Sequence, residues 1–368
     1  MRSLHMFNAV IVKAKRTPIG KVNGQFKHVP PQQLMTSILR NLVEGLTVPI
    51  DDVILGNVVG PGGNVARFSV LEAGLPMEVP GMTIDRQCSA GLEAIRLASY
   101  FIKSGAGQCY IAGGVESAST SPFSKRAQFS PKEIGDPDMV EAAENVAKKF
   151  YVSKEQQDTY ALTSYERTWR TFENEHLQQE IIPIQQLEYD EELYKKRDLT
   201  ILLKRIRPLL EEGTVTAANS CGIHDGASAV LVMEEELAIQ QGFQPVLRFT
   251  DSVVIGNHPN YPGAAPIPAI QQLLKKQQLT VEQIDLFEIN EAFASKIVAC
   301  MQELNIPLEK INCGGGALTI GHPYGASGSI LITRLFYEVQ RRKNLKYVVA
   351  AIGSGGGIGV AVLFEVVV

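Results

Sequence analysis

The sequence lacks the features that mark secreted, membrane-spanning and nucleic-acid-binding proteins. Its five cysteines are odd in number, scattered and without CxxC spacing, which disfavours both a disulfide framework and a zinc site. No apolar run approaches the length of a membrane span, and the run at 9–12 is too short for a signal-peptide core. The net charge of −4 leaves no basic surface suited to nucleic acid. We therefore expect a cytoplasmic protein without a metal site, and neither a membrane nor a nucleic acid as its partner.

What is present is ordinary for a globular protein with a sizeable core. The chain has 368 residues, of which 45% are hydrophobic and 20% are charged. At about 150 residues per domain, this length predicts two domains or one large unit with two lobes.

Strand-like and helical segments alternate along most of the chain, which predicts an α/β fold with mainly parallel strands. Between residues 117 and 207 the pattern changes to amphipathic helices, the clearest at 138–150 and 154–177. We therefore expect an inserted helical loop domain that covers a ligand. The predicted units are an N-terminal half (1–118 with 213–240), the insert (119–212) and a C-terminal half (241–368).

The two halves repeat one design. Residues 46–57 and 279–290 each open with Leu-Thr-Val and end in asparagine, at Asn57 and Asn290. In each half a loop, a helix, a strand and a glycine-rich turn then follow, and the repeat places Cys88 and His322 in corresponding loops. Because reactive groups gather at the carboxyl ends of strands in such sheets, we expect the two halves to bring these residues together.

Cys88 lies between an apolar run at 79–84 and a helical pattern at 92–101, so we expect a strand-to-helix junction there, with Ser89 as the helix cap. Free N–H groups at a helix N-terminus carry partial positive charge, which lowers the pKa of a thiol and favours the reactive thiolate. The position therefore predicts a nucleophile with a pKa below about 8.5. The alternative is a buried structural cysteine that packs like a small hydrophobic residue.

Four stretches stand out together: the segment around Cys88, Asn290-Glu291-Ala292-Phe293, Gly321-His322-Pro323 and Gly355-Gly356-Gly357. In this order the set resembles the thiolase family, which comprises acetyl-CoA acetyltransferases and 3-ketoacyl-CoA thiolases. Segments at 16–20, 112–117, 143–147 and 213–217 are also similar to the family's pattern. The resemblance therefore covers nearly the whole chain.

The resemblance implies a thiolase-like fold of two pseudo-symmetric α/β halves in five layers, αβαβα. It implies acyl-CoA and coenzyme A as substrates, no permanently bound cofactor, and a homodimer or homotetramer; the uncharged strand at 109–112 also suggests self-association. Cys88 matches the cysteine that takes up the acyl group, and His322 matches the histidine that activates it. Asn290 matches the asparagine that orients a water in one oxyanion hole, while the N–H groups of Cys88 and Gly355 match the second.

The chemistry of these residue types agrees with the resemblance. Acyl transfer needs an activated nucleophile, a neighbouring base and fixed donors where the oxyanion develops. The alternatives are that His322 is a satisfied structural histidine and that Asn290 merely closes a turn.

Three positions depart from the family's pattern. Gly353 stands where the family has a second cysteine, which moves the proton at the substrate α-carbon, and glycine cannot do so. Cys221 stands where serine is frequent near the pantetheine arm of coenzyme A. Cys313 lies in a glycine-rich loop where an apolar residue is usual, and either reaches the site or simply packs. Arg207 is a candidate for the nucleotide end of coenzyme A, with a solvated surface arginine as the alternative.

These observations predict a thiolase-type acyltransferase of fatty acid metabolism that resembles acetyl-CoA C-acetyltransferases and forms a thioester at Cys88. Thiolysis or Claisen condensation would be impaired by Gly353, and Gly353→Cys is expected to raise thiolysis. The alternative is a non-catalytic acyl-CoA-binding or scaffolding subunit. The presence of Cys88, His322 and Asn290 favours the enzyme, whereas Gly353 favours the alternative.

Overall fold

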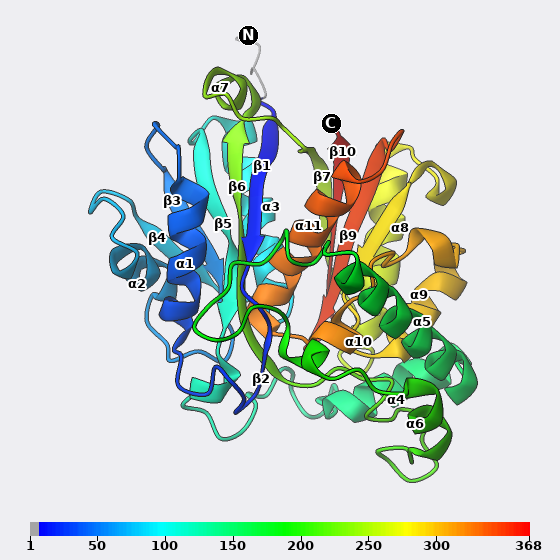
Figure 1. The fold of residues 1–368 in the computed structure, drawn as a ribbon. Helices are drawn as coiled ribbons and strands as arrows, with labels where there is room; N and C mark the ends of the chain where they lie inside the picture. Colours follow the sequence, from blue (N-terminus) through cyan, green and yellow to red (C-terminus); the bar gives the residue numbers. More distant parts are fainter. Residues whose placement is uncertain (1–6) are drawn as a thin grey trace.

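A computed structural model describes residues 7–368 (Figure 1). The strands in this range form one ten-stranded sheet. Their bounds are β1 (Ala9–Arg16), β2 (Gly20–Lys21), β3 (Asp52–Gly56), β4 (Gly81–Ile84), β5 (Cys109–Glu116), β6 (His224–Glu234), β7 (Leu247–Gly256), β8 (Leu286–Ile289), β9 (Tyr347–Ser354) and β10 (Ile358–Val366). The helices are α1 (Pro31–Val43), α2 (Val65–Glu72), α3 (Ala90–Ser104), α4 (Met139–Lys149), α5 (Lys154–Glu173), α6 (Leu199–Arg205), α7 (Glu235–Gln240), α8 (Pro266–Gln277), α9 (Ala294–Leu304), α10 (Ala317–Ile320) and α11 (Tyr324–Gln340).

The strands are ordered β4-β3-β5-β6-β1-β7-β10-β9-β8, with β2 paired to β6. The two halves of the chain join where β1 pairs antiparallel with β7, through Val10 with Arg248 and Ile11 with Leu247. The sheet therefore has an N-terminal part from β4 to β1 and a C-terminal part from β7 to β8.

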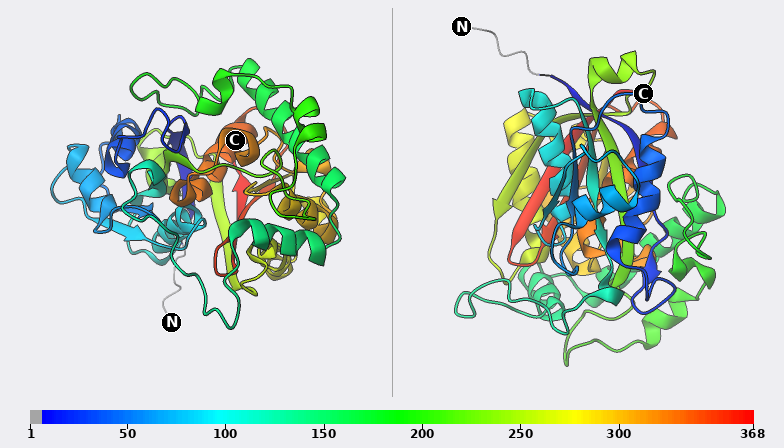
Figure 2. Two further views of the ribbon diagram at one scale, coloured as in Figure 1. Left: turned by 90° about the horizontal axis from the view of Figure 1, so that it is seen from below. Right: turned by 90° about the vertical axis from the view of Figure 1, so that its left-hand side faces the viewer.

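Three apolar cores divide these parts into layers (Figures 1 and 2). Helices α1 and α2 pack on the outer face of the N-terminal strands, with Leu34 and Val70 in that core. Helices α3 and α11 lie between the two parts, where Leu92 and Leu335 share one core with strands of both halves. Helices α8 and α9 cover the outer face of the C-terminal strands. This arrangement confirms the expected five layers, αβαβα.

The expectation of mainly parallel strands is wrong. β3 pairs parallel with β4 and β5, and β8 pairs parallel with β9. The pairs that involve β6, β7 and β10 are all antiparallel. Since β9 and β10 are joined by the short glycine turn at 355–357, they must lie antiparallel, whereas parallel neighbours need a crossover.

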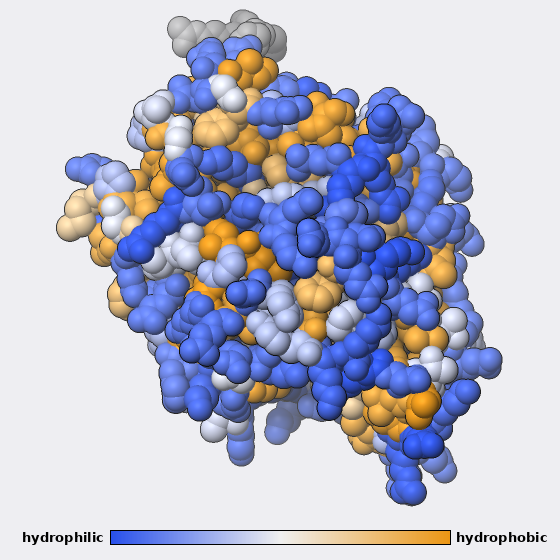
Figure 3. Space-filling view, in the orientation of Figure 1, coloured by the Kyte–Doolittle hydropathy of each residue, from blue (hydrophilic) through white to orange (hydrophobic). Residues whose placement is uncertain are grey.

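The segment between β5 and β6 carries α4, α5 and α6 and packs across the ends of both halves (Figure 2). Helix α5 begins with a capping box, in which Ser153 and Gln156 bond each other's backbone N–H groups. Trp169 of α5 packs against a core that includes Ile330 of α11, so the insert is fixed to the central layer. Figure 3 shows apolar side chains gathered where this segment reaches the surface, and Ile201 and Leu209 are among its exposed residues.

Candidate active site

One large cavity collects residues from both halves and from the insert. Its volume is about 650 Å³. The lining includes Cys88, Cys221, Lys296, His322, Gly353 and Gly355. The structure thus confirms that the two halves bring Cys88 and His322 to one site, as the internal repeat predicts.

Cys88 sits on a sharp turn between β4 and α3, as expected. The preceding residue, Gln87, has φ 50, a left-handed conformation that costs about 1–3 kcal/mol unless the surroundings hold it. Asp85 holds it, because its Oδ1 accepts hydrogen bonds from the Gln87 N–H at 2.6 Å and from Nε2 at 3.1 Å. Ser89 occupies the N-cap position, but its side chain does not cap the helix. Its hydroxyl instead bonds the hydroxyl of Ser354 in the other half.

The expected low pKa of Cys88 is wrong. Burial raises the pKa of its thiol to about 11, although part of the residue remains accessible from the cavity. Three influences act in the opposite sense and favour the thiolate: the charge of the Lys296 amine, and hydrogen bonds from the backbone N–H groups of Cys88 itself and of Gly355. Cys88 does lie at the N-terminus of a helix, but in this enclosed site the loss of hydration raises the thiol pKa by more than the helix N-terminus lowers it. Cys88 is therefore a neutral thiol whose sulfur faces two N–H donors.

His322 is also neutral. Burial, together with the nearby Lys296 and His224, lowers the pKa of its imidazole to about 3. The Ser327 hydroxyl donates to the Pro323 carbonyl at 2.8 Å and lies 2.5 Å from His322 Nδ1. Because that hydroxyl proton is already used, Nδ1–H donates to Ser327, which leaves Nε2 as the lone-pair nitrogen. A neutral imidazole of this tautomer can accept a proton.

Asn290 does not line the large cavity. It is 2% exposed, and its Nδ2 has no hydrogen-bond partner within residues 7–368. It lines a separate small cavity of about 10 Å³ together with Gly321 and Ser327. That volume is close to the minimum that holds one water. Its predicted role of orienting a water stays a prediction.

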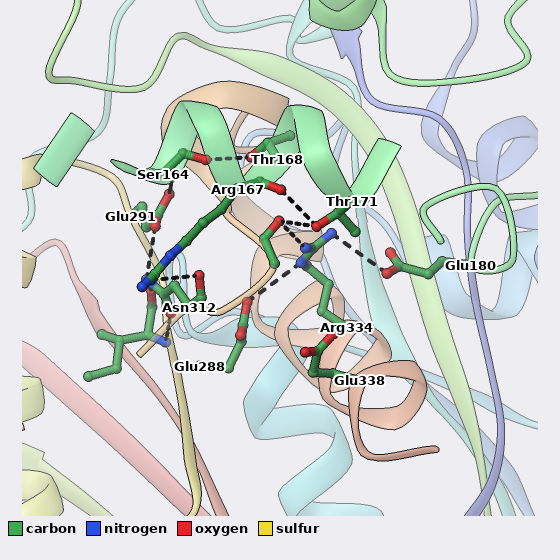
Figure 4. Close-up of polar contacts among 12 residues, drawn as sticks. Ser164, Arg167, Thr168, Thr171, Glu180, Glu288, Glu291, Asn312, Arg334 and Glu338 are labelled. Carbon is green, nitrogen blue, oxygen red and sulfur yellow. Dashed lines mark hydrogen bonds and ion pairs between the residues drawn. The ribbon is translucent and has the colours of Figure 1, made fainter. Parts of the chain in front are cut away.

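Glu291, the next residue, fixes this loop to the insert (Figure 4). Its carboxylate accepts hydrogen bonds from Tyr160 at 2.6 Å, Ser164 at 2.7 Å and Asn312 Nδ2 at 3.0 Å. Figure 4 also shows Arg334 reaching the same helix region, where its guanidinium donates to the Gly314 carbonyl. Helix α5 is thus bound to the loop that carries Asn290.

Gly353 lines the cavity next to a tight turn at Pro262–Ala264. A Cβ added at Gly353 would lie 2.4 Å from the Pro262 carbonyl oxygen and 2.9 Å from Pro266 Cδ. Both distances are too short for real contacts, so the turn fills the space that a side chain at this position would need. The absence of a side chain at Gly353 is therefore matched by the surrounding backbone.

The remaining predicted residues divide into two groups. Cys221 lines the cavity, and its N–H donates to the Ala292 carbonyl at 2.9 Å. Arg207 is exposed and does not line the cavity, so nothing in the structure favours its predicted coenzyme A contact. Cys313 packs elsewhere, with its thiol donating to the Glu309 carbonyl at 2.9 Å, which supports the packing alternative.

Two residues that the sequence did not single out also line the cavity. Arg126 lies in the insert, where it pairs with Asp136 at 2.9 Å. Lys296 is 2% exposed on α9, three residues beyond the Asn290–Phe293 motif. The only available signal was that closeness to the motif, because lysine in a helical pattern is normally a surface residue.

Residues 7–368 contain no group of three or more His, Cys, Asp or Glu side chains arranged to hold a metal ion. In the same range, no helix is both long and apolar enough to cross a membrane.

The chain matches known proteins along nearly its whole length, including the residues that line the cavity. Residues 9–236 match the family model "Thiolase, N-terminal domain", and residues 243–366 match "Thiolase, C-terminal domain". The chain is 56% identical over 361 residues to the Bacillus subtilis (strain 168) protein named "Putative acetyl-CoA C-acetyltransferase YhfS", covering 98% of this chain and 99% of that protein. It is 46% identical over 381 residues to "Putative acetyl-CoA C-acetyltransferase VraB" of Staphylococcus aureus (strain MSSA476), covering 98% and 99%. The crystal structure of the Bacillus anthracis acetyl-CoA acetyltransferase matches with a TM-score of 0.92 and 34% identity, covering 99% of this chain and 100% of that one.

Proposed function

This chain belongs to the thiolase family, and on that premise we propose that it transfers acyl groups between coenzyme A thioesters, with Cys88 as the acyl carrier. The relatives named as acetyl-CoA C-acetyltransferases support this reaction class. The observation that carries the assignment is the position of the Cys88 sulfur, which faces the N–H of Gly355 in the cavity that His322 also lines.

The neutral charge states define the first step. The Cys88 thiol gives its proton to Nε2 of His322 as the sulfur attacks the thioester carbonyl carbon. The N–H groups of Cys88 and Gly355 stabilise the oxyanion, and one such donor contributes about 2.7–4 kcal/mol to the transition state. The coenzyme A thiolate then leaves and takes the proton from the imidazolium. The raised pKa of Cys88 and the lowered pKa of His322 both oppose ionisation before the attack, so the proton transfer must accompany formation of the carbon–sulfur bond and of the stabilised oxyanion.

The cavity has the size of a small-molecule site. Its walls are mainly apolar, with Val146 and Leu209 among the lining residues, and they suit an acyl chain and a pantetheine arm. Arg126 places a guanidinium on the same lining and remains partly exposed. Since guanidinium groups bind phosphates well, we assign the coenzyme A phosphates to Arg126 in preference to Arg207.

Self-association is proposed at a different strand from the expected one. The uncharged segment at 109–112 lies within β5, which is buried between β3 and β6 and cannot contact another subunit. β4 is instead an open edge of the sheet. The adjacent α2 exposes Phe68 and Leu71, and an edge strand beside exposed apolar side chains favours pairing with a second copy.

A non-catalytic acyl-CoA-binding subunit is the second candidate, and Gly353 is the observation that favours it. With no side chain at Gly353, the site lacks the group that the family uses at the substrate α-carbon. Retained binding with no transfer to Cys88 would identify this function.

Intact-protein mass spectrometry after incubation with acetyl-CoA, and separately with longer acyl-CoAs, tests the proposal. The wild type should gain one acyl group, and Cys88→Ala should gain none. Cys109→Ala provides the control, because Cys109 is buried in β5 outside the cavity and its loss should leave the increment unchanged. An acyl group on Cys88→Ala would refute the assignment, while an unmodified wild type that still binds acyl-CoA would support the second candidate.

A further inference from the structure

Lys296 is a buried lysine without a partner. It is 2% exposed, lines the cavity beside Cys88, and its Nζ makes no hydrogen bond within residues 7–368. Lysine is almost never fully buried unless it is paired, because burial removes the hydration of the ammonium group. An unpartnered buried amine on a residue that lines a cavity therefore points to a functional demand rather than to packing.

The stem of Lys296 lies against the same turn that closes the space at Gly353. A Cβ added at Gly263 would lie 3.3 Å from Lys296 Cβ, so this glycine lets the lysine stem pass. On its other side, the turn places the Pro262 carbonyl where a side chain at Gly353 would stand. The turn at Pro262–Ala264 thus excludes a side chain from Gly353 and makes room for Lys296.

The charges around Lys296 do not offset the effect of its burial on its pKa. Burial is the largest influence and lowers its pKa, against the opposing influence of Cys300, Cys88, Cys221 and Glu291. Glu291 forms no salt bridge with Lys296, because its carboxylate is bonded to Tyr160, Ser164 and Asn312.

The other groups that face Lys296 are two cavity thiols, Cys88 and Cys221, the thiol of Cys300 one turn along α9, and the neutral His322. None of these groups is a carboxylate that would fix the proton on Nζ. No ion pair within residues 7–368 therefore blocks proton exchange at Nζ.

We propose that Lys296 is the catalytic residue that moves the proton at the α-carbon of the substrate thioester, in place of a side chain at Gly353. This inference rests on the proposed function of the site. In the condensing direction, the α C–H bond of acetyl-CoA breaks and its proton forms a new N–H bond on the Lys296 amine. The enolate electron pair forms a carbon–carbon bond to the carbonyl of acyl-Cys88, and the C–S bond to Cys88 breaks. The ammonium then returns the proton to the Cys88 thiolate, so both groups end as they began.

Two measurements separate this step from acylation of Cys88. The first is the mass increment on Cys88 with acetyl-CoA, and the second is deuterium uptake into the acetyl group of acetyl-CoA in deuterium oxide. Thiolysis of acetoacetyl-CoA is followed in parallel. Lys296→Met should leave acylation near the wild-type rate but slow deuterium uptake and thiolysis by about 10²–10⁴-fold, the usual contribution of a positioned acid–base group.

Lys296→Arg sharpens the test, because arginine keeps the positive charge but stays protonated at all working pH values. It should lose deuterium uptake as Lys296→Met does. Cys109→Ala is the control, since it removes a buried thiol outside the cavity and should keep all three activities. Ethylamine added to Lys296→Ala should restore part of the deuterium uptake, which a purely structural lysine would not allow.

The outcomes distinguish failure of this inference from failure of the proposed function. A wild type that never acylates Cys88 would overturn both. A wild type that acylates, with a Lys296→Met that exchanges deuterium at the wild-type rate, would overturn the role of Lys296 alone. A folded Lys296→Met that loses acylation and exchange equally would also overturn it, because Lys296 would then act on Cys88. If that variant does not fold, the pH profile of wild-type exchange decides: it should rise with a midpoint below the usual lysine value of about 10.4, and a flat profile refutes the role.

Discussion

Asn57 and Asn290 follow equivalent strands, β3 and β8, in the two halves of the chain, and both are buried. Asn57 Nδ2 donates to the Val115 carbonyl at 2.9 Å and to Glu116 Oε1 at 3.1 Å. Asn290 Nδ2 has no partner among residues 7–368. The same amide is thus fully engaged in structure in one half and left available in the other.

The strand registers explain this difference. Gly56 of β3 pairs with Gly114, and Ile289 of β8 pairs with Ala351. Two residues further along the neighbouring strand, the N-terminal half has Glu116 and the C-terminal half has Gly353. Glu116 is therefore the counterpart of Gly353, and its carboxylate is the partner that Asn290 lacks.

The Glu116 carboxylate also fixes the loop that follows β3. It also accepts hydrogen bonds from the backbone N–H groups of Val58, Val59 and Gly325, at 3.0–3.1 Å. Gly353 has no side chain to play this part, and the Pro262 carbonyl occupies the space where one would begin. One half thus pairs its asparagine with a carboxylate, whereas the other has glycine at the corresponding position and leaves the Asn290 Nδ2 without a partner among residues 7–368.

The largest expected difference between the two halves is the effect of the asparagine variants on kcat. If the free amide of Asn290 helps to stabilise an oxyanion, Asn290→Ala should lower kcat for thiolysis by about 10²–10³-fold, as loss of one such donor does. Asn57→Ala should leave kcat near the wild-type value, because the Asn57 amide is already bonded to the Val115 carbonyl and the Glu116 carboxylate. Steady-state kinetics of both variants with acetoacetyl-CoA measures the contrast. Equal losses in the two variants would contradict it.

The pH dependence of Cys88 alkylation should show how burial in the cavity changes the pKa of its thiol. The pKa of its thiol rises from 9.0 to about 11 through burial. Since the thiolate is the species that reacts with iodoacetamide, the alkylation rate should increase with pH up to about 11. At pH 8 the thiolate fraction should be about a hundredfold below that of a thiol with pKa 9.0. Rate measurements on the wild type, with Cys88→Ala as background, test this, and a midpoint below 8.5 would restore the helix N-terminus as the dominant influence.

Stability should show the reverse ranking of the two asparagines. Asn57→Ala leaves the Val115 carbonyl without its side-chain donor and removes one donor from Glu116, so it should lower the free energy of unfolding by about 1–3 kcal/mol. Asn290→Ala removes an amide whose N–H donors already lack an acceptor, and should cost less. Urea unfolding of both variants measures the difference. A larger loss for Asn290→Ala would show that its amide is also structural.

The sequence predicted the order of the elements and the meeting of Cys88 with His322, because both follow from local patterns and from the internal repeat. It did not predict the antiparallel pairs of β6, β7 and β10, since strand direction depends on partners far along the chain. The pKa of Cys88 was predicted in the wrong direction because the depth of its burial is set by tertiary packing. Lys296 was missed for the same reason: the turn at Pro262–Ala264 and helix α4 bury it, and neither is adjacent in sequence.

Gly353→Cys should show whether the site tolerates a side chain at Gly353, the position that corresponds to Glu116 in the other half. The sequence alone predicted a gain in thiolysis, but the structure favours the opposite outcome. A Cβ at Gly353 would lie 2.4 Å from the Pro262 carbonyl oxygen, so the turn must move, and overpacking of this kind costs about 1–3 kcal/mol. That turn also supports Lys296, so its displacement should lower thiolysis further. Gly353→Ala adds the same Cβ without a thiol and should lose equal stability in urea unfolding. A gain in thiolysis for Gly353→Cys but not for Gly353→Ala would show that a thiol at this position can act in thiolysis. It would also show that the turn can move to admit a side chain, and that the backbone around Gly353 does not require Lys296 for this role.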